Sequence, residues 1–159
     1  MKIDIIAVGK IKEKFYRDAI AEYTKRLSRY CTLELIEIPD EKTPDQISQV
    51  QINQIKVKEG KGIINRIKPG SYVFALAIQG LNYTSEGLSK KLQQITIQKS
   101  SHLTFIIGGS LGLSDEVLQL ANEHISFSSM TFPHQLMRVI LVEQIYRSFR
   151  IQMNEPYHK

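Results

Sequence analysis

The sequence predicts an α/β fold, in which a mainly parallel sheet is flanked by helices on both faces. Short apolar runs alternate with segments of helical periodicity along the chain. Most of these runs are apolar at consecutive positions, as strands are when both faces of a parallel sheet are covered. The chain of 159 residues is 42% hydrophobic and 23% charged. This composition is typical of a globular protein, and we expect one domain over residues 1–159.

The first half of the chain predicts two strands and two helices. The runs 2–9 and 31–38 are strands by length and apolar content, and Pro39 ends the second one. Apolar side chains recur at helical spacing over 13–29, which predicts an amphipathic helix. Pro44 and Asp45 are expected to open a second helix that continues weakly to Ile67.

The second half continues the alternation of strands and helices. Three further strands are expected at 71–78, 102–107 and 124–129. The helices expected between and after them cover Thr84 to about Gln98, Ser114 to Ala121, and Pro133 to Met153. Parallel strands joined in this way place their carboxyl ends at one edge of the sheet, where ligands bind.

Composition also excludes several classes of protein. The single cysteine, Cys31, cannot form an internal disulfide, and the four histidines lack zinc-like spacing, so we expect no metal site. No apolar run approaches the ~18 residues of a membrane span. The first residues read as a strand and not as a signal peptide, and we expect a cytoplasmic location.

The net charge of +5 is unevenly distributed. Residues 41–70 carry 6 basic and 3 acidic side chains, and residues 126–159 carry 4 and 2. Such an excess favours an anionic macromolecule such as RNA as a partner. A solvated lysine-rich surface with no partner is the other interpretation, and the charge count leaves both open.

A glycine-rich turn, Gly108 to Gly112, follows the strand at 102–107 and precedes a helix. Glycines there let a ligand approach backbone groups closely. Phosphate is disfavoured because no Lys-Ser/Thr pair follows and because Asp115 and Glu116 occupy the first turn of the helix. A neutral or partly cationic ligand such as S-adenosylmethionine fits better, although a tight turn that binds nothing has the same pattern.

Three stretches of the sequence resemble a known family. They are FIIGGSLGLSDEV (105–117), SFSSMTFPHQLMRVILVEQIYRSFRI (126–151) and the terminal EPYHK (155–159). In order, spacing and position they resemble the SPOUT superfamily of knotted methyltransferases, and within it the small bacterial enzymes that modify pseudouridine in large-subunit ribosomal RNA. The resemblance implies a deep carboxy-terminal trefoil knot, a homodimer, and S-adenosylmethionine-dependent methylation of N3 of a pseudouridine in 23S rRNA of the assembled 70S ribosome.

The resemblance also implies which residues bind the cofactor. The matching positions are Leu76, Gly108, Phe127, Ser128, Ser129, Met130, Thr131 and Phe132. One position departs from the family pattern: Ala77 stands where relatives commonly have Asp, so a polar contact from that side chain is missing. We expect this loss to weaken cofactor binding without abolishing it, because backbone groups of the pocket would still bind the cofactor.

The terminal residues gain roles from the same resemblance. Tyr157 and His158 are expected to be catalytic: Tyr157 can stack on an extruded base, and His158 can bind the uracil edge or accept its proton. Arg138, Arg147 and Lys159 are expected to bind RNA. Arg138 falls on the apolar side of its helix, so a buried ion pair or hydrogen-bonded arginine is an equally weighted interpretation.

Two other functions stay open at this point. One is a methyltransferase of the same superfamily that acts on tRNA, and the other is a non-catalytic module that binds RNA or the ribosome. The small size of the chain, with no appended RNA-binding domain, disfavours the tRNA enzyme.

Overall fold

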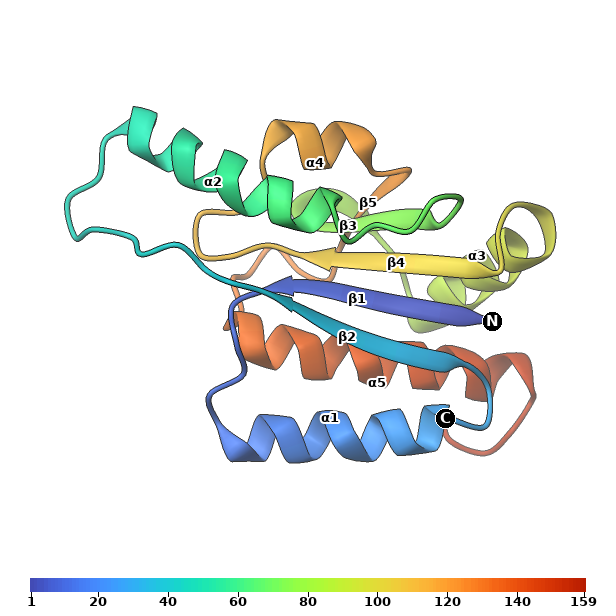
Figure 1. Cartoon of the computed structure of the whole chain (residues 1–159). Coiled ribbons are helices and arrows are strands. Elements are labelled where there is room, and N and C mark those ends of the chain that lie inside the picture. Colours follow the sequence, from blue (N-terminus) through green and yellow to red (C-terminus); the bar gives the residue numbers. More distant parts are fainter.

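The computed structural model describes residues 1–159, and a five-stranded parallel sheet forms its centre (Figure 1). The strand order across the sheet is β2-β1-β4-β3-β5. The strands are β1 (Lys2–Val8), β2 (Thr32–Ile38), β3 (Tyr72–Asn82), β4 (His102–Ile107) and β5 (Glu123–Ser126). The predicted α/β fold with a sheet of parallel strands is therefore confirmed.

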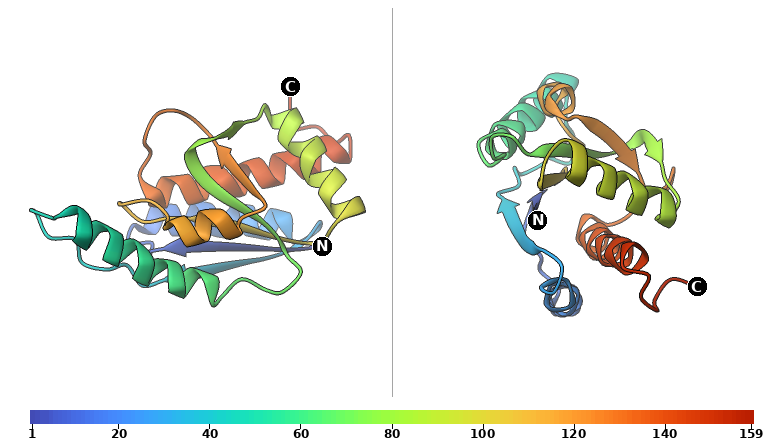
Figure 2. Two further views of the ribbon diagram at one scale, coloured as in Figure 1. Left: turned by 90° about the horizontal axis from the view of Figure 1, so that it is seen from above. Right: turned by 90° about the vertical axis from the view of Figure 1, so that its right-hand side faces the viewer.

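Helices cover both faces of this sheet (Figure 2). On one face lie α1 (Lys14–Leu27), α3 (Ser85–Gln98) and α5 (His134–Gln152). On the other face lie α2 (Gln49–Ile64) and α4 (Asp115–Leu120). No helix is both long enough and apolar enough to cross a membrane.

The first strand shows why the apolar runs lack alternation. Ile3 and Ile5 pack into the core formed with α1, α3 and α5, whereas Ile6 and Val8 pack into the core formed with α2 and α4. All four side chains are buried. Both faces of the strand therefore select apolar residues, as expected for a covered parallel sheet.

One predicted helix boundary is wrong. The helix expected to open at Pro44 and Asp45 begins at Gln49, because Ser48 is its N-cap. The Ser48 hydroxyl accepts the N–H of Gln51 at 3.2 Å, and the Gln51 side chain accepts the N–H of Ser48 at 2.9 Å. This reciprocal capping box satisfies two backbone donors, and the residues around Pro44 offer no comparable cap.

Strands β3 and β5 also differ from the expected ranges. β3 extends to Asn82 through a shift in register, in which Leu76 and Leu81 both face Ile125 of β5. Gly80 makes this possible, since a Cβ there would lie 2.6 Å from the backbone of Ile125. β5 ends at Ser126, and the following residues to Pro133 form no strand. Both departures shape the cavity described next.

Candidate functional site

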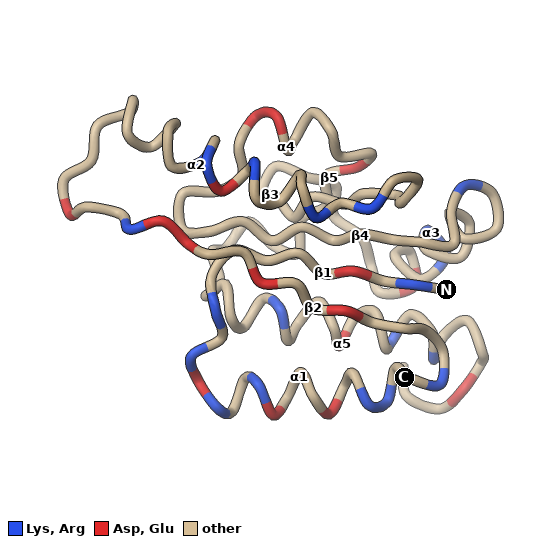
Figure 3. Tube along the Cα trace, viewed as in Figure 1, with Lys and Arg blue, Asp and Glu red and all other residues tan.

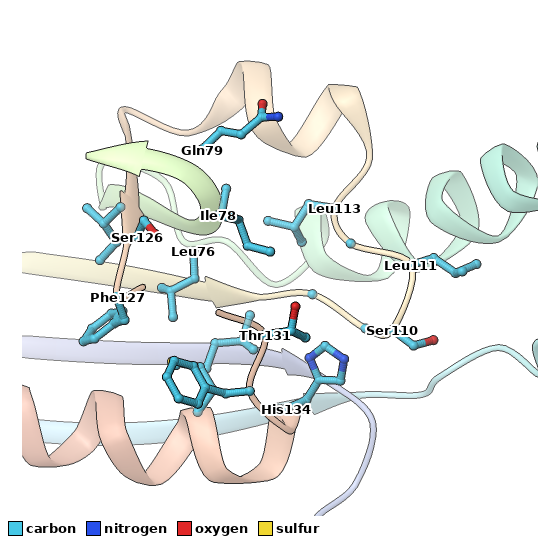
Figure 4. Close-up of a pocket in the computed structure, with 18 of the residues that line it drawn as sticks. Leu76, Ile78, Gln79, Ser110, Leu111, Leu113, Ser126, Phe127, Thr131 and His134 are labelled. Atoms are coloured by element: carbon cyan, nitrogen blue, oxygen red, sulfur yellow. The ribbon is translucent and has the colours of Figure 1, made fainter. Parts of the chain in front are cut away.

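A cavity of about 610 Å³ lies where three strands end (Figure 4). Its walls are the end of β3 with the residues that loop out of its ladder, the glycine turn after β4, and the loop after β5. These segments are far apart in the sequence and meet because the strands are parallel. The position matches the rule that α/β proteins bind ligands beyond the carboxyl ends of their strands.

The glycine turn forms one wall of the cavity. A Cβ on Gly108 would lie 3.0 Å from Leu113 and 3.1 Å from the backbone of Gly112, so this position accepts no larger side chain without distortion. Gly112 has a φ of +85°, and its N–H bonds the carbonyl of Gly109 at 3.0 Å. The turn therefore presents backbone, not side chains, at Gly108.

The loop after β5 forms the opposite wall. The Ser126 hydroxyl donates to the carbonyl of Ser128 at 3.1 Å, and the Ser128 hydroxyl accepts the N–H of Met130 at 3.0 Å. These bonds within the loop give it a defined path before Pro133 starts α5.

Seven of the eight residues expected to bind a cofactor line this cavity. They are Leu76, Gly108, Phe127, Ser128, Met130, Thr131 and Phe132. Ser129 belongs to the same loop but is exposed and does not line the cavity. Ala77, the position without the family's Asp, lies in the wall as well.

Sequence reasoning missed other residues of the wall. Ile78 and Gln79 enter it because the shift in register takes them out of the β3 ladder. Lys56 reaches it from α2, and His134 reaches it from the first turn of α5. Burial and then the charge of Arg138 lower the pKa of His134, so its imidazole is held neutral near pH 7. The sequence contains one signal for His134 as a wall residue: it directly follows Pro133 and the loop expected to bind the cofactor.

The terminal residues lie elsewhere on the same chain. His158 Nε2 is 2.8 Å from Glu86 Oε1, and its Nδ1 is 3.2 Å from Arg147 Nη1. None of these residues lines the cavity. A helix rises ~1.5 Å per residue, so Arg147 lies about 15 Å along α5 from Met137, the last residue of this helix in the cavity wall. The expected meeting of tail and cavity therefore does not occur within one protomer.

Tyr157 is held by polar and aromatic contacts with α5 and α1. Its hydroxyl donates to Glu143 Oε1 at 3.0 Å and lies 3.4 Å from the Tyr23 hydroxyl. Its ring packs edge-on against Tyr146, with centroids 4.9 Å apart. Burial, followed by these hydrogen bonds, raises the pKa of Tyr157, so the phenol stays neutral.

The three residues expected to bind RNA lie in different environments. Arg138 is only 1% exposed; its guanidinium donates to the carbonyls of Val8 and Gly9 at 2.7 and 2.8 Å and pairs with Glu37 at 3.3 Å. A side chain this buried has no surface to offer RNA, and its contacts fix the start of α5 to the end of β1. Arg147 pairs with Glu143 at 2.6 Å and stacks over the ring of Tyr157, whereas Lys159 is exposed.

The fold and the position of this cavity are those of an α/β protein that binds a ligand at the ends of its strands, and the chain belongs to the SPOUT methyltransferase family. A family described as "Predicted SPOUT methyltransferase" matches residues 1–158. No three His, Cys, Asp or Glu side chains are grouped as a metal site requires.

Relatives of known name cover the whole chain. Proteins named "Ribosomal RNA large subunit methyltransferase H" from Exiguobacterium sibiricum and Enterococcus faecalis are each 55% identical over 159 residues, with full coverage of both chains. A protein from Clostridium perfringens named "Ribosomal RNA large subunit methyltransferase H 1" is 56% identical over the same length. A solved structure, "a probable methylase family protein from Haemophilus influenzae Rd KW20", superposes with a TM-score of 0.55 at 12% identity, covering 99% of this chain and 70% of that one. The last similarity concerns the fold alone.

Proposed function

We propose that this protein transfers a methyl group from S-adenosylmethionine to N3 of a pseudouridine in 23S rRNA of the assembled 70S ribosome. The observation that carries the proposal is the cavity, whose walls contain seven of the eight residues expected to bind the cofactor. The names of the relatives support large-subunit rRNA as the substrate. A ribosomal substrate also implies that the protein works in the cytoplasm.

The cavity fits the proposed cofactor in size and chemistry. Its volume of about 610 Å³ lies within the usual range for small-molecule sites, and 12 of its 22 lining residues are hydrophobic. Leu76, Phe127 and Phe132 offer apolar surface to an adenosine, and the backbone at Gly108 can be approached closely. S-adenosylmethionine, when bound, supplies an electrophilic methyl group on a positively charged sulfonium. No carboxylate lines the wall, which agrees with recognition through backbone and apolar groups.

The residues of this chain then have to orient the base and accept one proton. Most of the rate enhancement should come from alignment of the reacting atoms. His158 is the proposed group that binds the uracil edge or accepts the N3 proton. His134, whose pKa is lowered by burial and by the charge of Arg138, is an imidazole in the cavity wall, placed to bond the base or the cofactor.

We also propose that the active unit is a homodimer in which the tail of each protomer completes the cavity of the other. The distance along α5 supports this arrangement, since about 15 Å of helix separates Arg147, which contacts His158, from Met137 in the cavity wall. Tyr157 and His158 would then meet the substrate only in the assembled dimer. The trefoil knot implied by the resemblance stays a prediction.

The test is methyl transfer from labelled S-adenosylmethionine to three purified substrates: assembled ribosomes, free 23S rRNA and tRNA. We expect label only in ribosomes, recovered as 3-methylpseudouridine after digestion of the large-subunit RNA. Label in tRNA would instead indicate the related tRNA enzyme. Binding to ribosomes without transfer, and without cofactor binding by calorimetry, would indicate a non-catalytic module.

A further inference from the structure

The second half of α2 and the turn that follows it form a basic surface, and most of its cations lie outside the cavity. Residues 46–85 contain five basic side chains, Lys56, Lys58, Lys61, Arg66 and Lys68, and one acidic side chain, Glu59. Glu59 is only 7% exposed and accepts the N–H of Glu41 at 3.1 Å. The exposed charge of this segment is therefore entirely positive. Figure 3 marks the basic residues along α2 and the chain leading to β3, with Glu59 as the one acidic residue among them.

Four of these five cations have no ion-pair partner. Only Lys58 forms an ion pair, with Glu41 at 3.0 Å; the other four have no carboxylate within 4.0 Å. On α1, by contrast, Lys14 pairs with Asp18 and Arg26 pairs with Glu22. A merely solvated helix face usually resembles α1, with charges of both signs interspersed.

Uncharged side chains occupy the outer face of α2 between these cations. Asn53 and Gln54 lie beside Lys58 and Lys61 in a shallow groove of about 450 Å³, together with two exposed valines, Val50 and Val57. Amide side chains and lysines are the groups that bond phosphate and sugar oxygens in nucleic-acid complexes. The neighbouring helix α4 carries the exposed Asp115 and Glu116, which limit the basic surface on that side.

Lys56 is the one cation of the basic surface that lies at the cavity. This lysine comes from α2, lines the cavity and has no carboxylate partner. Lys56 repels the sulfonium and the ammonium of S-adenosylmethionine and attracts only its single carboxylate, so the cofactor, whose net charge is positive, does not account fully for this lysine. Lys56 does favour the approach of a polyanion to the mouth of the cavity.

We infer that α2 from Lys56 onward and the turn to Lys68 bind the phosphate backbone of the rRNA strand that carries the target base. This inference rests on the proposed function and assigns it a substrate-binding surface. RNA is a better occupant than a second copy of the chain, since a two-fold interface would place this positive surface against itself. Lys56 would hold the phosphate nearest the cavity, and Lys61, Arg66 and Lys68 would hold phosphates farther along the strand.

The experiment compares two triple variants with the same change in net charge. The first, K56Q/K61Q/K68Q, removes three cations of the basic surface. The control, K2Q/K25Q/K90Q, removes three exposed lysines of β1, α1 and α3 that also lack ion pairs. Binding to ribosomes is measured over a series of salt concentrations, and unfolding midpoints establish that both variants fold.

We expect the first variant to bind ribosomes about tenfold or more weakly at ~0.1 M salt, with a dependence of log K on log salt that is roughly 2 less steep, as loss of three phosphate contacts predicts. The control should keep the slope and affinity of the wild type. Equal binding by both variants, or equal losses in both, would overturn the inference. Loss of binding to anionic phospholipid vesicles with unchanged ribosome binding would overturn it too, in favour of a membrane.

Failure of this inference can be distinguished from failure of the proposed methyltransferase function. A wild-type protein that binds ribosomes through α2 but transfers no methyl group would support this surface while contradicting the enzyme. A wild-type protein that methylates ribosomes and tolerates the loss of the three lysines would contradict this surface alone.

Discussion

His158 is the residue whose role depends most on what surrounds it in the assembled protein. In the single chain its imidazole contacts Glu86 and Arg147, which are both outside the cavity. The contact with Glu86 lies at the surface, where it adds little to stability. Because breaking this weak contact costs little free energy, the imidazole of His158 can move into the cavity of a partner chain in the proposed dimer.

We expect His158→Ala to lower the rate of methyl transfer to ribosomes about 100-fold, the lower end of what a positioned proton acceptor contributes. Cofactor affinity measured by calorimetry should stay nearly unchanged, because His158 is proposed to act on the base and not on the cofactor. His124→Ala is the control, since His124 is exposed and its imidazole bonds only the carbonyl of Leu118. Activity of His158→Ala equal to that of the control would remove His158 from the site.

Glu123 is a residue whose role is structural and depends on pH. Its carboxylate accepts hydrogen bonds from Tyr72 and Tyr83 and pairs with Lys91 at 2.7 Å, which ties the start of β5 to β3 and α3. Burial alone would raise the pKa of this carboxyl, but the contacts with Lys91 and Tyr83 outweigh burial and lower it. The carboxylate therefore stabilises the fold above the ordinary glutamate pKa, and this contribution is lost as the pH falls through the lower folded pKa.

We predict that Glu123→Gln lowers the free energy of unfolding by about 1–3 kcal/mol at neutral pH, because partners of a buried carboxylate lose a charged acceptor. The difference between wild type and variant should shrink as the pH is lowered below about 4. Urea unfolding at several pH values and one protein concentration measures it. A difference that stays constant or grows towards acid pH would show that the charge of Glu123 does not stabilise β5.

At the scale of elements, the packing of α2 on α4 depends on a glycine inside a helix. A Cβ on Gly60 would lie 3.2 Å from the Cβ of Ser114 and 3.3 Å from the side chain of Val117. It would lie even closer to the hydroxyl of Ser114. That hydroxyl caps α4 by accepting the N–H of Val117. The two helices therefore approach each other through Gly60, directly behind the glycine turn of the cavity.

Gly60→Ala should destabilise the protein by about 1–3 kcal/mol, although alanine is the better helix former, because the added methyl group overpacks the contact with α4. Thermal or urea unfolding measures the change. The matched substitution Gln54→Ala, at an exposed position of the same helix, should have an effect within about 0.5 kcal/mol. A stabilised Gly60→Ala would show that α2 and α4 can separate without cost.

The elements also show what sequence patterns can and cannot predict. Helix ends with a side-chain cap were predictable: Thr84 and Ser114 begin α3 and α4 as expected. The start of α2 was missed because Pro44 resembles a helix start, and the capping box at Ser48 was passed over. The extension of β3 could not be predicted, because it depends on the approach of Gly80 to Ile125, which belongs to a strand 45 residues later in the chain.

Some residues of the candidate site could be predicted from the sequence and others could not. The loop residues from Phe127 to Phe132 were identified through the family resemblance, and all but Ser129 line the cavity. Lys56 and Gln79 were missed, since neither belongs to a motif and only the packing of α2 and the irregular end of β3 bring them there. Arg138 was identified as unusual by its position on an apolar helix face, but its partners on β1 are tertiary contacts that periodicity cannot supply.

At the scale of the whole molecule, the separation of tail and cavity predicts sharing of active sites between protomers. A heterodimer can combine one subunit carrying His158→Ala with a partner carrying Gly108→Val, which fills its own cavity wall. If each tail serves the other subunit's cavity, the His158→Ala subunit keeps an open cavity and receives an intact tail from its partner. We therefore expect this heterodimer to retain about half of the wild-type rate, which is one working site of two.

Each homodimer of the single variants should have about 1% of the wild-type rate or less in the same methylation assay. A heterodimer as slow as these two homodimers would show that the tail serves its own chain, and a large movement of the last residues would then be required. Separately tagged subunits, purified in two steps, provide the mixed species without contamination by homodimers.

The central claim, that this chain methylates large-subunit ribosomal RNA, is tested most directly by mass spectrometry of 23S rRNA from cells that lack the protein. We predict that one fragment of 23S rRNA, containing a pseudouridine, is lighter by a single methyl group, and that the wild-type gene restores it while Gly108→Val does not. An unchanged 23S rRNA, or a methyl group missing from tRNA instead, would contradict the account.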